Sequence, residues 1–165
     1  MIHICLASQT LVHVTHTSTT SFPISSSKHG HGQSEGSYQT PLGAHQVHSI
    51  IGLNQPIFTQ FSAREPIMHH ASCPDSTEDL ILSRIIRLKG LEDGYNAGHD
   101  QNLKCVDSFH RYIYIHGTNQ ENLIGRKDSI GCIRMLNHDI ISLCHQISIN
   151  EKVHIACSIE VQHEC

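Results

Sequence analysis

The chain contains 165 residues, of which 38% are hydrophobic and 16% are charged, and its formal net charge is −4 with neutral histidines. This length fits one domain, and we expect residues 1–165 to form it, with a core over about residues 2–157. The few Lys and Arg residues are scattered, which argues against a nucleic-acid partner, and no apolar run reaches the ~18–20 residues of a membrane span. Residues 1–8 lack the basic and apolar regions of a secretory signal, so none is predicted.

The first third of the chain has the pattern of β-strands. Thr, Val and Ile dominate it, and apolar residues alternate with polar ones at a period near two. Strands are predicted over residues 2–6, 9–17, 21–27 and 44–52. Residues 28–38 carry three glycines and are predicted to be a flexible loop.

The rest of the chain mixes strands and irregular segments. Residues 53–77 have little periodicity and are predicted to be an irregular connection or lid. Residues 79–89 fit either a helix or a strand, and residues 90–104 read as a polar loop. Strands are predicted over 111–115, the clearest alternating run, and over 152–157.

One segment has the spacing of a helix. Asn137 is predicted to be its N-cap, and Asp139 lies in the first turn, where the helix dipole favours an anion. The apolar repeat at i, i+3, i+4 and i+7 consists of Ile140, Leu143, Cys144 and Ile147. The predicted fold is therefore mostly β with one packed helix.

The seven cysteines and sixteen histidines raise the questions of disulfides and metals. The cysteines have no framework spacing, and four are expected to be buried apolar residues: Cys5, Cys105, Cys144 and Cys157. The pairs His29-Gly30-His31 and His69-His70 could clip a metal, but zinc-finger spacing and an H-E-x-x-H motif are both absent. We therefore expect no metal site.

His116 and Cys132 could meet as base and nucleophile. A thiol near its free pKa of ~8.5 is only a few per cent thiolate at neutral pH. A nearby imidazole helps either by holding a thiolate–imidazolium pair or by taking the proton during attack. His116 is predicted to end the strand over 111–115, with Gly117 letting the backbone turn away.

Residues around the cysteine suggest supporting roles. Gly131 would let a substrate approach backbone N–H groups that form an oxyanion hole. Ser129 could add a hydroxyl to that hole or simply make the turn. Arg134 could clamp a substrate carboxylate, or form a structural ion pair, for instance with Asp139 or Asp107.

These residues resemble a family signature. The segments His116–Asn119 and Ser129–Arg134 are similar to the motif of the L,D-transpeptidase catalytic domain (YkuD) family, a histidine followed by Ser-His-Gly-Cys-x-Arg. Ile130 stands where most members have a second histidine. Gly36–Gly43 resembles the family's Gly-Ser-x-x-Thr-Pro-x-Gly element, and residues 2–157 align in order with the catalytic domain.

The resemblance implies a curved mixed β-sandwich and a reaction. Cys132 would be the nucleophile and His116 the proton donor and acceptor, its second ring nitrogen held by a backbone carbonyl near Gly117 or Thr118. The implied activity is that of an L,D-transpeptidase, which forms an acyl-enzyme from a peptidoglycan stem peptide and passes it to an amine. The resemblance implies no cofactor and a location in the periplasm or cell envelope, and we expect a monomer.

Two alternatives to this activity remain. The first is a peptidoglycan L,D-carboxypeptidase or amidase on the same scaffold, and the second is a catalytically silent cell-wall-binding protein. Ile130 bears on this choice because isoleucine donates no side-chain hydrogen bond to a developing oxyanion. Alternatively, Ile130 packs against the strand predicted over residues 111–115.

Overall fold

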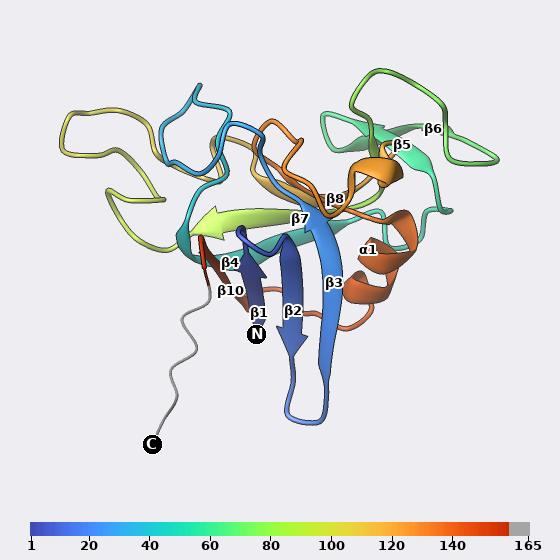
Figure 1. Cartoon of the computed structure of the whole chain (residues 1–165), viewed down its shortest axis with the longest axis horizontal. Helices are drawn as coiled ribbons and strands as arrows, with labels where there is room; N and C mark the ends of the chain where they lie inside the picture. The colour runs from blue at the N-terminus through green and yellow to red at the C-terminus, as the bar shows by residue number, and fades with distance from the viewer. Residues whose placement is uncertain (159–165) are drawn as a thin grey trace.

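The computed structural model describes residues 1–158, which form ten strands, one α-helix and one short 3₁₀ helix (Figure 1). The first strands are β1 (Ile2–Cys5), β2 (Thr10–Val14), β3 (Thr19–Ser25), β4 (Gly43–Ile51), β5 (Thr59–Ser62) and β6 (Glu65–His69). They are followed by β7 (Ile81–Gly90), β8 (Tyr114–Thr118), η1 (Glu121–Leu123), β9 (Ile133–Met135), α1 (Asn137–Cys144) and β10 (Lys152–Ala156).

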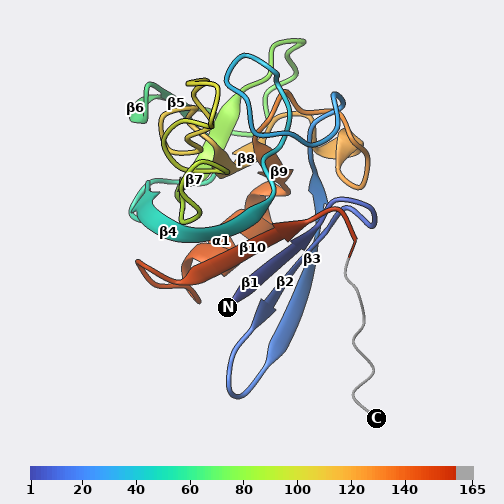
Figure 2. The same ribbon diagram turned by 90° about the vertical axis from the view of Figure 1, so that its left-hand side faces the viewer.

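The strands form one mixed sheet that closes on itself. Their order is β4-β10-β1-β2-β3-β9-β8-β7-β5-β6, and an additional pairing joins β4 to β7. Pairs β1–β10 and β8–β9 are parallel, whereas the other pairs are antiparallel. The prediction of a mostly β domain with one helix is confirmed. The pairings describe a barrel-like ring with the β5–β6 hairpin attached to β7 (Figure 2), rather than the two separate sheets of the predicted sandwich.

Alternation along β8 and β9 decides what lies inside the ring. Ile115, Ile133 and Met135 belong to the main core, together with apolar residues of α1. Because successive side chains of a strand point to opposite faces, the even-numbered residues of both strands point the other way. Several long loops gather near that region, on the upper side of Figure 1. The core therefore sets the orientation of the side chains on the outer face.

The strand predictions for the first third of the chain are confirmed within a few residues by β1, β2, β3 and β4. The ambiguous segment 79–89 is strand β7, which is buried on both faces and so shows no alternation in the sequence. The predicted irregular segment 53–77 contains the hairpin β5–β6. All five residues of β6 are exposed, so no apolar face marked this strand in the sequence.

Two local predictions were wrong in detail. Residues 111 and 112 lie in a turn, residue 113 has no regular secondary structure, and β8 runs from Tyr114 to Thr118. His116 therefore lies inside the strand instead of at its end. The N-cap of α1 is Leu136, and the Asn137 N–H donates 2.7 Å to Oε1 of Glu121. A carboxylate from η1 therefore caps the helix, which a local reading of the sequence could not reveal.

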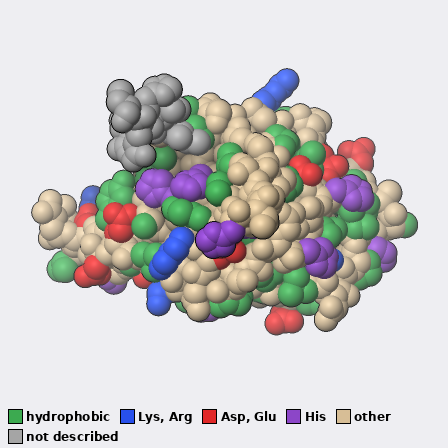
Figure 3. All heavy atoms as spheres, turned by 90° about the horizontal axis from the view of Figure 1, so that it is seen from below, with side chains coloured by type: hydrophobic (Ala, Val, Ile, Leu, Met, Phe, Trp, Pro, Cys, Tyr) green, Lys and Arg blue, Asp and Glu red, His purple; other side chains and the backbone are tan. Residues whose placement is uncertain are grey.

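The cysteine prediction is only partly confirmed. Cys5 and Cys144 are buried, but Cys105 is half-buried and Cys157 is exposed, just beyond the end of β10. On the face of the molecule shown in Figure 3, Lys and Arg side chains are few and form no continuous positive patch. No helix within residues 1–158 has the length and apolar character needed to cross a membrane.

Candidate active site

The outer face of β8 and β9 brings the predicted base and nucleophile into one region. The two strands are parallel, with Ile115 opposite Ile133 and His116 opposite Arg134. Cys132 directly precedes β9, two residues before Arg134, so alternation puts it on the same face as His116. Within the described residues no direct hydrogen bond joins the thiol to the imidazole, and the Cys132 thiol donates 3.5 Å to the carbonyl of Tyr112.

The His116 ring is held in one tautomer by its own strand. The side chain is 2% exposed, and its Nδ1–H donates 2.7 Å to the carbonyl of Gly117. This leaves Nε2 unprotonated and free to accept a proton. The predicted backbone carbonyl is thus present. The reason for glycine at 117 differs from the prediction, because a Cβ there would collide with Asn137 Oδ1 and the carbonyl of Leu82.

The electrostatics favour neutral forms of both groups. Burial, the largest cause, raises the pKa of Cys132 to about 11, partly offset by a backbone hydrogen bond from Tyr114. Burial also lowers the pKa of His116, with the Gly117 hydrogen bond opposing it. Asp79 and Arg134 influence the pKa of both residues. The pairing at rest is therefore thiol and imidazole, which favours proton removal during attack over a preformed ion pair.

A network of small polar groups shapes the segment over residues 129–132, which we call the nucleophile turn after the predicted role of Cys132. Gly131 has φ of +128°, a conformation that L side chains rarely adopt, and its N–H donates 3.3 Å to Oγ of Ser129. The Ser129 hydroxyl in turn donates to the carbonyl of Cys132. The buried Thr40 hydroxyl donates 2.9 Å to the carbonyl of Gly131 and accepts from the N–H of Ser27. These contacts favour the turn-making alternative for Ser129.

Arg134 forms structural ion pairs, as one of the two alternatives predicted, but with other aspartates than the examples given. It is 3% exposed, and its guanidinium lies 2.6 Å from Asp79 and 3.1 Å from Asp128, not beside Asp139 or Asp107. The terminal nitrogen that contacts Asp128 also donates 3.0 Å to Gln120 Oε1. Both terminal nitrogens are thus engaged with protein groups, and a contact with substrate stays a prediction. No sequence pattern marked Asp79 as a partner.

A pocket of about 340 Å³ opens beside Cys132. Its lining includes Arg111, Ile130 and the aromatic side chains of Tyr38 and Tyr112. Ile130 is 52% exposed, so it lies at the pocket surface rather than in a core. Arg111 was missed as a site residue. Its guanidinium donates to the carbonyls of Gly32, Gln33 and Gln39 and so holds the loop before β4 against the pocket.

The family is decided by a match along almost the whole chain. The model of the L,D-transpeptidase catalytic domain family, YkuD, matches residues 1–155. The chain belongs to this family. None of the curated proteins matches it significantly.

Solved structures of L,D-transpeptidases have the same fold. The chain is 11% identical to an L,D-transpeptidase from Mycobacterium smegmatis, with a TM-score of 0.54 over 94% of this chain and 57% of that one. For L,D-transpeptidase 3 from Mycobacterium tuberculosis with a faropenem-derived adduct, the identity is 16%, the TM-score 0.53 and the coverage 93% and 58%. For the enzyme from Xylanimonas cellulosilytica the values are 16%, 0.52, 94% and 59%. The chain thus spans less than two thirds of these structures, and at such identities the likeness concerns the fold alone.

Proposed function

We propose that this chain is a single L,D-transpeptidase catalytic domain that uses Cys132 to form an acyl-enzyme from a peptidoglycan stem peptide and transfers the acyl group to an amine. The observation that carries the proposal is the arrangement of His116 and Cys132 on one face of two parallel strands, within a chain of this family. The proposed location is the periplasm or cell envelope, where peptidoglycan is. The proposed chemistry needs no cofactor.

The proposed reaction has two halves. In the first, Nε2 of His116 takes the thiol proton as Sγ of Cys132 attacks the carbonyl before the terminal residue of the stem. The tetrahedral intermediate collapses to a thioester, and His116 returns the proton to the departing amine. In the second half an acceptor amine attacks the thioester, its proton passes to His116, and the proton then restores the Cys132 thiol.

The backbone at the nucleophile turn is proposed to stabilise the oxyanion. Gly131 contributes a position without a side chain, and Ser129 holds the local backbone in shape through its contacts with Gly131 and Cys132. Arg134 is proposed to bias the site electrostatically, since both reactive residues respond to its charge, and to contact the substrate carboxylate only if an ion pair opens.

Acylation by a penem tests the nucleophile. One of the similar structures holds a faropenem-derived adduct, and we expect faropenem to add one adduct mass to this chain. Cys132→Ala should abolish the adduct, while Cys144→Ala, a change at a buried cysteine of α1, should reduce stability and leave the adduct intact. An adduct that persists on the Cys132 variant would refute the assignment.

The products on a natural donor separate the candidate activities. Disaccharide-tetrapeptide with an amine acceptor should yield a cross-linked product and the released terminal amino acid, read by mass spectrometry. Release without cross-linking would identify a carboxypeptidase. Binding of the donor with neither product and no faropenem adduct would identify a silent wall-binding protein.

A further inference from the structure

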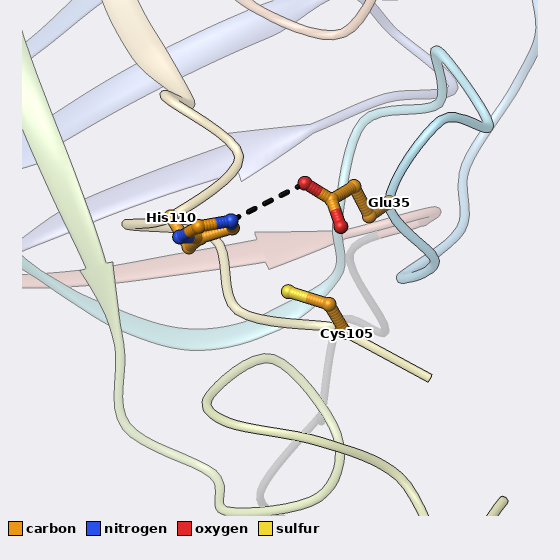
Figure 4. Close-up of side chains that lie close together, drawn as sticks. All are labelled: Glu35, Cys105 and His110. Carbon is orange, nitrogen blue, oxygen red and sulfur yellow. Dashed lines mark ion pairs between the residues drawn. The ribbon is translucent and has the colours of Figure 1, made fainter. Parts of the chain in front are cut away.

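A second cluster of reactive side chains lies beside the catalytic pocket. Glu35, Cys105 and His110 each offer one ligand atom, and these three atoms lie within 4.8 Å of one another. Figure 4 shows the carboxylate, the sulfur and the imidazole directed toward a common space from two different loops. The cluster borders a cavity of about 240 Å³, whose lining also includes His99 and Asp107.

We propose that Glu35, Cys105 and His110 form a binding site for a zinc-type divalent cation. A thiolate, an imidazole and a carboxylate are the ligand types that zinc takes in proteins, and three protein ligands leave a fourth position for water. Zinc–ligand bonds of about 2.0–2.3 Å in a tetrahedron separate the ligand atoms by roughly 3.3–3.8 Å. Oε1 of Glu35 and Nε2 of His110 are 3.4 Å apart, so this edge already fits.

The distances from the Cys105 sulfur to the other two ligand atoms need only a small decrease. With all ligand atoms within 4.8 Å, the sulfur has to approach by at most about 1.5 Å to reach tetrahedral separations. Side-chain rotation supplies such a shift, because Glu35 and His110 are exposed and Cys105 is half-buried. Binding would replace the Cys105 thiol proton by the metal and release that proton to solvent.

The backbone that carries the ligands is already ordered. The N–H of Glu35 donates 2.8 Å to the carbonyl of Cys105, which ties the two loops together. The Asp107 carboxylate accepts the N–H groups of Phe109 and His110 at 2.9 and 3.0 Å and so fixes the turn between the second and third ligands. The cost of organising the site on binding is correspondingly small.

The proposed metal site lies on two loops that border the pocket beside Cys132. Glu35 belongs to the loop between β3 and β4, whereas Cys105 and His110 belong to the loop between β7 and β8. Glu35 and His110 also line the pocket that contains Cys132. A bound metal would therefore cross-link two loops that form the wall of that pocket. The inference concerns a site distinct from the catalytic pair and does not depend on the proposed function.

Cobalt and zinc titrations of the intact chain test the proposal. Co²⁺ should produce thiolate-to-cobalt charge-transfer absorption, and Zn²⁺ should displace it. Cys105→Ser should remove this absorption and weaken metal binding at least tenfold. Loss of a group that only hydrogen-bonds to a metal ligand already weakens binding by about that factor, and Cys105 is a ligand itself. Cys73→Ser, at another half-buried thiol, is the matched control and should leave binding unchanged.

Two further measurements keep the test independent of folding and of catalysis. Glu35→Gln should weaken binding by roughly tenfold, while Glu65→Gln on the exposed strand β6 should not. Zn²⁺ should also protect Cys105 from alkylation, read residue by residue by mass spectrometry, without protecting Cys73. Absence of binding, or binding that survives Cys105→Ser and disappears with Cys132→Ala, would overturn the proposal. Neither measurement uses a peptidoglycan substrate.

Discussion

The resting state of the Cys132 thiol determines what His116 has to do. With a pKa of about 11, the thiol would be only about 0.01% thiolate at pH 7. The lowered pKa of His116 keeps its imidazole neutral, and the Gly117 carbonyl leaves Nε2 as the basic atom. The site is therefore suited to general-base catalysis, in which the proton moves as the sulfur attacks.

Replacement of His116 should slow reaction of the thiol. His116→Gln should reduce the rate of Cys132 alkylation at pH 7 by about 10²–10⁴-fold, because a general base contributes that much. The remaining rate should rise with pH toward the thiol pKa of about 11. His138→Gln, at an exposed position of α1, is the control. An unchanged pH profile in the His116 variant would remove this residue from the mechanism.

The pH dependence of the proposed acylation follows from the same pKa shift. In the proposed mechanism the neutral imidazole is the active form, and it predominates above the pKa of His116. Because burial lowers that pKa, the acid limb of the acylation rate should lie below the ordinary histidine value of about 6.5. A limb above that value, in a pH–rate profile with faropenem, would contradict the assigned environment.

Ile130 can be tested by restoring the family's usual histidine. If an oxyanion donor is missing, Ile130→His should raise the acylation rate by up to about 10²–10³-fold, with less gain if the backbone N–H groups already suffice. Stability should change little because Ile130 is 52% exposed. Ile149→His, at a position that is 51% exposed, is the control. A fall in both rate and melting temperature would identify Ile130 as a packing residue.

At the scale of elements, the nucleophile turn depends on a residue distant in the sequence. Thr40 lies in the loop that enters β4, and its hydroxyl bridges the Ser27 N–H and the Gly131 carbonyl. Its side chain is fully buried, so water cannot replace these hydrogen bonds. This contact gives a physical role to the Gly36–Gly43 element.

Removal of the Thr40 hydroxyl should affect both stability and acylation. Thr40→Val should lower the free energy of unfolding by about 1–3 kcal/mol, since two buried backbone groups lose a partner. The acylation rate of Cys132 should fall as well, because the turn loses a restraint on Gly131. Thr19→Val, at an exposed position of β3, is the matched control for urea unfolding and kinetics. A stable and fully active Thr40 variant would refute this role.

At the scale of the whole molecule, His45 links two parts of the fold. It lies on β4, one of the strands that close the ring, and it contacts the loop between β7 and β8. This buried histidine has its Nδ1–H donating 3.0 Å to the Gly43 carbonyl, while Nε2 accepts from the Ser108 hydroxyl at 2.9 Å. Both ring nitrogens are thus satisfied in the neutral form. Burial, the largest cause, lowers the pKa of His45 to about 4.

This shift predicts loss of stability in acid. Between about pH 6.5 and 4 the unfolded chain binds a proton at His45 that the folded chain does not, so the free energy of unfolding decreases as pH falls. The contribution is on the order of 3 kcal/mol. Urea midpoints across this range should show a shallower pH slope for His45→Gln than for the intact chain. His48→Gln, exposed on the same strand, should keep the original slope. Equal slopes for the His45 variant and the intact chain would contradict the prediction.

Patterns in the sequence were enough to predict the family and the class of fold, and they also gave His116 and Cys132 as the candidate base and nucleophile. The motif around His116 and Cys132 is local, and so is the helical repeat of α1, whose turns depend on residues three and four apart. Strands with one buried face were predicted because alternation records burial directly in the sequence. Strand β7 is buried on both faces and β6 is exposed on both, so neither has this alternation, and neither could be predicted as a strand from the sequence.

Which distant groups come together depends on the tertiary structure. The pairing of β4 with β7 closes the ring, Asp79 neutralises Arg134, and Thr40 supports the nucleophile turn. The cluster of Glu35, Cys105 and His110 likewise combines residues from two loops, and no short-range motif in the sequence predicts it. Such contacts depend on chain topology and loop packing, because the energy of an ion pair, hydrogen bond or metal ligand set depends on spatial separation and not on distance along the chain.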